Sequence, residues 1–229
     1  MFFLSSDNHG SVDLRLNSKN FIAGQYLKRS DKVAFLGDEE LHLYKNRGFE
    51  FLAEQKWTSL LIEGNHDHLP TYFNAPLVEF CGGNARQLAE NIYYLQRGEV
   101  YEIDNKKFFV MGGALSIDRN YRYPEVSWFE AEVPSEADFK FAEQRLESLN
   151  WEVDYVLSHT CPLNCIDLFF LPVHPNDAYY DKTWDRLENI REKLKFKHWY
   201  FGHWHRDVSK EEDGRKYTIL YREIRALEK

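Results

Sequence analysis

Short β-rich runs that each end in a cluster of histidine, aspartate and asparagine are the feature that most constrains the fold of this chain. The runs at residues 1–4, 32–36 and 59–62 stop at SSDNHG, GDEE and EGNHD, respectively. Longer helix-compatible stretches follow such runs, an order typical of α/β architecture. Because ligands bind at the carboxyl ends of strands in open α/β sheets, we expect these polar clusters to converge on one site.

The rest of the sequence predicts further helices and strands in addition to these three strands. A helix is expected over residues 41–55, and another begins at the N-cap Ser135 and runs through about 148, with Asp138 completing a capping-box-like pair. The long aromatic segment 160–181 is expected to be an irregular loop. The last group of predicted elements comprises an antiparallel meander over 92–95, 100–103 and 107–111, a helix over 184–195, and strands at 154–157, 199–201 and 217–224.

Composition indicates an ordinary globular protein. The 229 residues, 43% hydrophobic and 29% charged, fit a single domain over 1–229, with no internal repeat or linker. The net charge of −8 argues against binding long nucleic acid by a basic surface, so we expect a small phosphorylated substrate or nucleotide as partner and leave the oligomeric state open. With no run of 18 apolar residues and only three cysteines, no membrane association and a cytoplasmic location are expected.

Five of the nine histidines lie at predicted carboxyl ends of strands. A random distribution would scatter them along the chain. Together with two aspartates and one asparagine they form eight polar groups from five strand ends: Asp7, His9, Asp38, Asn65, His66, His159, His203 and His205. Imidazole, carboxylate and amide ligands match divalent metals such as Mn²⁺, Zn²⁺ or Fe. The set lacks thiolates, which argues against a structural zinc site.

The spacing within each cluster suits metal binding. Residues two apart on an extended segment point the same way, so Asp7 and His9 can chelate one ion, and His203 and His205 can reach two neighbouring ions. Gly37 permits a sharp turn that places Asp38 at the sheet edge, where a carboxylate can bridge two ions.

These blocks, taken in order, resemble the calcineurin-like metallophosphoesterase superfamily, whose signature is DxH, GD, GNH followed by an acidic residue, a lone histidine, and GHxH. All five are present, from Asp7-Asn8-His9 through to the GHWH block at 202–205. The resemblance covers residues 7–205 and implies two packed mixed β-sheets flanked by helices.

The resemblance also implies roles for these residues. One divalent ion, Mn²⁺ in first place with Zn²⁺ or Fe as alternatives, is held by Asp7, His9, Asp38 and His205, and a second by Asp38, Asn65, His159 and His203. A hydroxide bridging the ions attacks the phosphorus of a phosphodiester or phosphomonoester. His66 is not a ligand and donates a proton to the leaving oxygen as general acid.

The chain departs from the family's Ser/Thr protein phosphatases, which are one alternative function. Leu41 stands where they carry an aspartate, and Glu63 where they carry an arginine before GN. A non-catalytic interaction protein that keeps the fold is a second alternative, against which the complete ligand set argues. A DNA-processing nuclease is a third, although only 24 residues follow His205 to supply a capping or dimerisation region.

The groups that would support catalysis are left open by the sequence. Glu39, Glu40 or Asp67 are the candidates to orient His66. The loop after the 107–111 strand offers two candidate phosphate-binding arginines, and two further histidines are candidates to line a pocket: Arg119, Arg122, His68 and His174.

Overall fold

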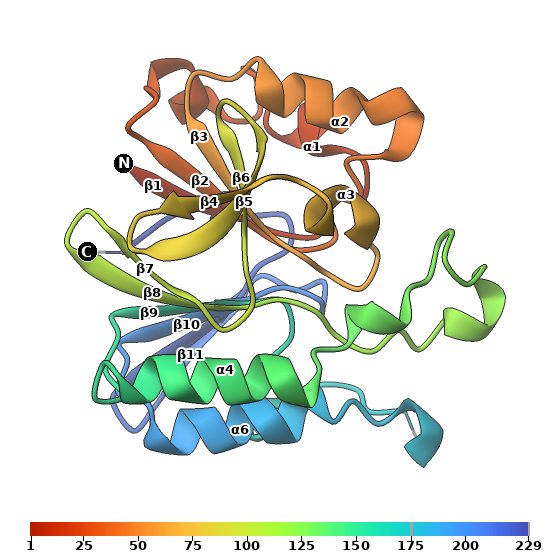
Figure 1. The fold of residues 1–229 in the computed structure, drawn as a ribbon, viewed down its shortest axis with the longest axis vertical. Coiled ribbons are helices and arrows are strands. Elements are labelled where there is room, and N and C mark those ends of the chain that lie inside the picture. Colours follow the sequence, from red (N-terminus) through yellow and green to blue (C-terminus); the bar gives the residue numbers. More distant parts are fainter. Residues whose placement is uncertain (175, 229) are drawn as a thin grey trace.

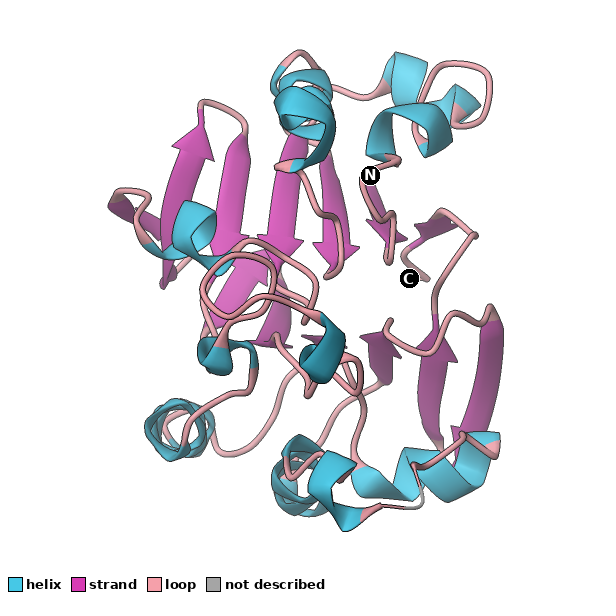
Figure 2. Ribbon diagram, turned by 90° about the vertical axis from the view of Figure 1, so that its right-hand side faces the viewer, coloured by secondary structure: helices cyan, strands magenta, loops and turns pink. Residues whose placement is uncertain are grey.

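Two β-sheets packed face to face, with helices on both outer surfaces, form the structure (Figures 1 and 2). The computed structural model describes residues 1–174 and 176–228. The first sheet has the order β13-β1-β2-β3-β6-β5-β4, and its strands are β1 (Phe2–Ser5), β2 (Lys32–Leu36), β3 (Thr58–Ile62), β4 (Leu77–Phe80), β5 (Gly83–Ala89), β6 (Ile92–Leu95) and β13 (Arg225–Ala226). The second has the order β11-β12-β10-β9-β8-β7, and its strands are β7 (Val100–Ile103), β8 (Lys106–Met111), β9 (Tyr155–Ser158), β10 (His198–Phe201), β11 (Val208–Glu212) and β12 (Arg215–Ile219).

Each sheet has a parallel centre and antiparallel edges. In the first sheet β1, β2, β3 and β6 are parallel, and in the second β8, β9, β10 and β12 are parallel. The strands outside these parallel centres run antiparallel to their neighbours: β13, β5 and β4 in the first sheet, and β7 and β11 in the second. This architecture confirms the predicted fold class of two packed mixed β-sheets flanked by helices.

The alternation of side chains along each strand divides the core into layers. On β2, Ala34 and Leu36 pack between the two sheets, whereas Val33 and Phe35 face outwards against helices. Helices α1 (Val12–Arg15), α2 (Leu43–Ala53) and α3 (Leu69–Phe73) contribute to the outer layer of the first sheet, and α4 (Glu136–Glu147), α5 (Leu163–Phe169) and α6 (Thr183–Lys193) to that of the second. In Figure 1, α2 covers one sheet at the top and α4 and α6 cover the other at the bottom.

The predicted helix starting at Ser135 is confirmed together with its cap. The Ser135 side chain accepts a hydrogen bond from the Asp138 backbone N–H, and the Asp138 carboxylate accepts one from the Ser135 backbone N–H. Of the helices formed by residues 1–174 and 176–228, none combines the length and apolar character required to cross a bilayer.

The predicted three-strand meander is wrong in its pairing, although its strands are in place. β6 pairs with β3 and β5 in the first sheet, whereas β7 and β8 form a hairpin in the second. The turn at 96–99 therefore carries the chain from one sheet to the other. Strand propensity locates each run, but the pairing partner is decided by packing that is distant in sequence.

Two further expectations near the carboxyl end need correction. The predicted strand 217–224 ends at Ile219 in β12, and a separate short strand, β13, pairs with β1. The segment 160–181, expected to be irregular, contains α5, whose residues Cys165, Ile166 and Phe169 pack into the core beneath the second sheet. Both cysteines of that segment, Cys161 and Cys165, are buried free thiols.

Candidate metal centre

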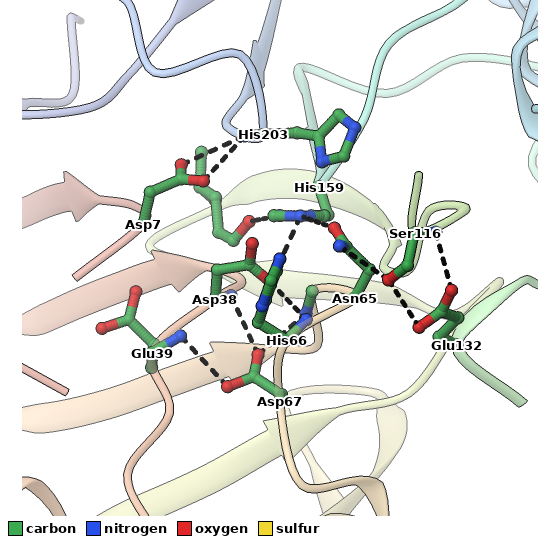
Figure 3. A network of polar contacts seen from close by, with 12 residues as sticks. Asp7, Asp38, Glu39, Asn65, His66, Asp67, Ser116, Glu132, His159 and His203 are labelled. Atoms are coloured by element: carbon green, nitrogen blue, oxygen red, sulfur yellow. Dashed lines mark hydrogen bonds and ion pairs between the residues drawn. The ribbon is translucent and has the colours of Figure 1, made fainter. Parts of the chain in front are cut away.

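The seven predicted ligands lie together where five strands end. Asp7 and His9 follow β1, Asp38 follows β2 and Asn65 follows β3, all in the first sheet. His159 follows β9, and His203 and His205 follow β10 in the second sheet. Because β1–β3 and β9–β10 are adjacent parallel strands, their carboxyl ends meet where the two sheets face each other (Figure 3).

The ligand atoms divide into two groups. Those of Asp7, His9 and His205 lie within 4.8 Å of one another, and so do those of Asp38, His159 and His203. Asn65 joins the second group, because its Oδ1 lies 3.0 Å from His159 Nε2. We call these the Asp7 group and the Asp38 group. Mixed carboxylate, imidazole and amide donors at these separations fit two neighbouring divalent ions.

The backbone at these ligands is unusual. Five of the seven have positive φ: Asp7 (52°), His9 (44°), Asp38 (58°), His203 (66°) and His205 (50°). The expectation of extended DNH and GHWH segments is therefore wrong, since both ligands in each segment have a left-handed backbone conformation. Such residues cost on the order of 1–3 kcal/mol each and persist where the surroundings impose them, as functional sites do.

Hydrogen bonds between the two loops hold this conformation. The backbone N–H groups of Asp7, His9 and Gly10 donate to the carbonyls of residues 37, 38 and 39. The Arg15 guanidinium donates to the carbonyls of Ser6 and Asp7, a support that the sequence did not reveal. The DNH loop is thus anchored to the GDEE loop on one side and to α1 on the other.

Glycine is required where the loops approach each other. Gly37 has φ +96°, and a Cβ atom there would lie 2.4 Å from His159 Nδ1. A Cβ atom at Gly64 would lie 2.0 Å from Asp38 Oδ1. The GD and GN pairs therefore permit ligands from different strands to come into contact.

Buried charge is distributed unevenly within the Asp38 group. Burial lowers the pKa of His159, but the charge of Asp38, 3.5 Å from its Nε2, outweighs this and raises that pKa to about 10. Burial, with His159 adding to it, lowers the pKa of His203 to about 3. A cation bound by this group would compete with the proton on His159, so metal binding is expected to release a proton.

Asp67, one candidate to orient His66, has another function. Its carboxylate accepts hydrogen bonds from the backbone N–H groups of Asp38, Glu39, Glu40 and Gly64 and from the Tyr72 hydroxyl. It therefore fastens the GDEE loop to the GNHD loop (Figure 3). Glu39 is buried and accepts from Asn8, which leaves Glu40 as the candidate whose carboxylate lies within 4.8 Å of a His66 ring nitrogen.

The two candidate arginines lie beside the site rather than in it. Arg119 donates to the Ala178 carbonyl and lies over the Tyr179 ring, and Arg122 donates to the Asn65 carbonyl and to Ser116 Oγ. Neither lines the two cavities that open at the ligand groups, and His68 does not line them either, whereas His174 does. The expectation that Arg119 or Arg122 contacts the phosphate is thus not supported, because neither side chain lines a cavity at the ligand groups.

Ser116 and Glu132 orient Asn65, a contact that sequence spacing did not indicate. Asn65 Nδ2 donates to Ser116 Oγ at 3.0 Å, and Ser116 Oγ donates to Glu132 Oε2 at 2.8 Å (Figure 3). The Ser116 backbone N–H also donates to Glu132, which is buried. With its amide nitrogen so held, Asn65 directs its Oδ1 towards the Asp38 group.

Ser116→Ala is expected to weaken Mn²⁺ binding about 10- to 100-fold, the usual effect of removing a group that orients a metal ligand. Calorimetric titration with Mn²⁺ measures this, and Ser116→Thr should restore binding because it keeps the hydroxyl. Ser127→Ala is the matched control, since within the described residues Ser127 Oγ accepts only the Tyr123 N–H, in the loop that follows Ser116. Unchanged Mn²⁺ affinity in Ser116→Ala would contradict the orienting role.

Glu63, at the position where the protein phosphatases carry an arginine, is fully buried in an ion pair. Its carboxylate contacts the Arg97 guanidinium, which also donates to the carbonyls of Ala131 and Glu132. The pair links the residue before GN to the segment that supplies Glu132.

Arg97→Met is expected to lower the free energy of unfolding by about 3–5 kcal/mol, because it leaves the Glu63 carboxylate buried and unpaired. Urea denaturation measures the change. The double variant Glu63→Met with Arg97→Met should lose less. Lys216→Met, which breaks a half-exposed pair with Glu228, is the control and should cost under about 1 kcal/mol. Equal losses for Arg97→Met and Lys216→Met would refute the expectation.

Comparison with known proteins agrees with this geometry. A sequence profile of the calcineurin-like phosphoesterases matches residues 2–207, and no curated protein matches the chain significantly. Among solved structures, a phosphopantetheinyl hydrolase from Mycobacterium tuberculosis superposes with a TM-score of 0.56 at 12% identity, covering 96% of this chain and 89% of that chain. At this identity the likeness shows the fold alone.

A second solved structure is a proposed 5′-nucleotidase from Staphylococcus aureus in complex with alpha-ketoglutarate. It superposes with a TM-score of 0.52 at 14% identity, covering 96% of this chain and 48% of that one, so this chain spans about half its length. The profile match over nearly the whole chain decides the assignment: this chain belongs to the calcineurin-like phosphoesterase family.

Proposed function

We propose that this chain is a two-metal phosphoesterase that hydrolyses a small phosphorylated substrate. The family implies metal-dependent hydrolysis of phosphoesters. The observation that supports two ions is the pair of adjacent ligand groups, Asp7 with His9 and His205, and Asp38 with Asn65, His159 and His203. Asp38 is the proposed bridge, because its carboxylate lies at the junction of the β2 and β3 loops.

The protein residues have separate tasks in this proposal. Two bound divalent ions, with Mn²⁺ our first choice, would supply Lewis acidity to the phosphoryl oxygens and lower the pKa of a water molecule. The ligand groups would hold the two ions where the sheets face each other, and the ions would bind the phosphate there. His66 is half-buried, lies outside both groups, and is the proposed donor of a proton to the leaving oxygen.

Two observations weigh against the protein-phosphatase alternative. Leu41, where those enzymes carry an aspartate, is buried in the outer core of the first sheet. Glu63, where they carry an arginine, is paired with Arg97, so this position offers an anion instead of a cation. The complete ligand set, with a cavity open at each group, weighs against a non-catalytic role.

Hydrolysis of bis-p-nitrophenyl phosphate and of p-nitrophenyl phosphate, with Mn²⁺ and with EDTA, tests the proposal. Mn²⁺-dependent release of p-nitrophenol from either compound is the expected result. Faster cleavage of the diester would identify a phosphodiesterase, and faster cleavage of the monoester a phosphatase. Protein that binds two Mn²⁺ ions and cleaves neither compound would overturn the proposal.

A further inference from the structure

Two cavities open at the ligand groups: one reaches the Asp7 group alone, and the other reaches the Asp38 group and also His205 of the Asp7 group. One, of 680 Å³, borders Asp7 and His9. The other, of 530 Å³, borders Asp38, Asn65 and His203 and also contains His66 on its wall. We call the second the His66 cavity. Its volume lies within the range of small-molecule sites.

The position of His66 indicates which part of a substrate enters the His66 cavity. A general acid must reach the oxygen that leaves, so the leaving group lies on the side of the phosphate where His66 lies. His66 lines this cavity and does not line the other one. This step rests on the proposed function, in which His66 protonates the leaving group.

The walls of the His66 cavity are aromatic and aliphatic. Trp184 and Trp204 lie with ring centroids 5.8 Å apart, and Tyr179 stands on another segment of the lining. Leu115, Ile117 and Val173 complete the apolar part. A flat ring bound against such side chains gains aromatic contacts as well as burial of apolar surface.

The charge of the lining is one-sided. Among the described residues that line the His66 cavity, none is lysine or arginine. Asp118, which lies 3.7 Å from Arg122 outside the lining, and Asp181 add carboxylates beyond the ligand groups. Phosphate groups away from a metal are usually bound by arginine or lysine. A second phosphate on the leaving group would therefore meet carboxylates, with no lysine or arginine in the described lining to bind it.

Contacts between two loops hold the outer wall in place. Asn120 Nδ2 donates to the Tyr179 hydroxyl at 2.6 Å, and Arg119 Nη2 donates to the Ala178 carbonyl at 3.1 Å. In Figure 1 the segments near residues 120 and 179 project on the same side of the molecule. Arg119 thus helps to position Tyr179, because its guanidinium contacts the Ala178 carbonyl and the Tyr179 ring.

We propose that the leaving group of the substrate carries an uncharged aromatic ring, which binds in the His66 cavity, and that a second phosphate on this group is rejected. Ring contacts to the tryptophans and Tyr179 would provide the affinity. The absence of a lysine or arginine in the described lining would provide the selectivity.

Calorimetric titration of the Mn²⁺-loaded full chain with three phosphonates tests this inference. The C–P bond prevents turnover, so binding is measured apart from hydrolysis. Methylphosphonate has no ring, benzylphosphonate has a ring, and p-xylylenediphosphonate has the ring and a second phosphonate. Benzylphosphonate is expected to bind about tenfold or more tightly than methylphosphonate, as stacking on aromatic side chains provides. The diphosphonate is expected to bind about fivefold or more weakly than benzylphosphonate.

A pair of lysine variants locates the selectivity. Ile117 is 61% exposed and lines the cavity, whereas Tyr121 is 90% exposed on the same loop and does not. Ile117→Lys should remove the discrimination against p-xylylenediphosphonate, and Tyr121→Lys should preserve it. Equal binding of methylphosphonate and benzylphosphonate would overturn the inference, as would equal effects of the two variants. Failure to hydrolyse both bis-p-nitrophenyl phosphate and p-nitrophenyl phosphate would instead count against the proposed function, because the order of phosphonate affinities does not depend on turnover.

Discussion

Asp38→Asn is expected to remove nearly all Mn²⁺-dependent hydrolysis of bis-p-nitrophenyl phosphate, a fall in kcat/KM on the order of a thousandfold or more. The Asp38 carboxylate is buried in the ligand group with His159 and accepts the backbone N–H of His66 at 2.8 Å. Asparagine removes the charge that would bridge two cations. Asparagine also tolerates the positive φ of 58° at this position, so the backbone should be kept.

Mn²⁺ content and thermal melting separate this effect from unfolding. Bound Mn²⁺ should fall while the melting curve remains cooperative. Asp104→Asn is the matched control, because Asp104 also has positive φ (51°) but lies exposed in the turn between β7 and β8. Retention of wild-type activity and of two Mn²⁺ ions by Asp38→Asn would rule out Asp38 as the bridge.

His66→Asn is expected to keep both metal ions while slowing hydrolysis by about 10²- to 10⁴-fold for esters with poor leaving groups. The His66 ring is grouped with His9 and Glu40 and not with either of the two proposed ligand groups, so its loss should leave both of those groups complete. A p-nitrophenolate needs little protonation as it leaves, whereas an alkoxide needs it strongly. The loss should therefore be much smaller with p-nitrophenyl esters than with alkyl esters of phosphate.

The ratio of kcat values for the two ester types, in the wild type and in His66→Asn, gives the comparison. His68→Asn is the control, since His68 lies two residues away, with its Nδ1 2.8 Å from the Thr71 hydroxyl. Equal losses for good and poor leaving groups would show that His66 acts otherwise than as the acid. Loss of Mn²⁺ would show that it is a ligand.

Much of the fold was predictable because buried strands appear in the sequence as short runs of apolar residues. The runs at 32–36, 92–95 and 100–103 coincide with β2, β6 and β7. The edge strands β4 and β11 were missed, and so was β5, which lies next to β4. β11, with the sequence VSKEE, is half-exposed and charged, and such edge strands lack the apolar run by which a buried strand is recognised.

The candidate ligands were also readable from the sequence, but for a partly mistaken reason. Histidines and carboxylates at strand ends marked the site, and the structure brings all seven together. The supposed mechanism, side chains alternating on extended segments, does not hold, because Asp7, His9, His203 and His205 have positive φ. Their convergence comes from hydrogen bonds between loops on different strands.

The sequence by itself determined the buried parallel strands, the helix cap at Ser135 and the candidate metal ligands, because these depend on periodicity, on neighbours a few residues apart and on side-chain chemistry. Only the tertiary structure decided how Ser116 and Glu132 hold Asn65, how Arg97 pairs with Glu63, and which cavity contains His66. These contacts join residues 16 to 51 positions apart. No local pattern specifies them, since they form only when the two sheets pack and bring the ends of their strands together.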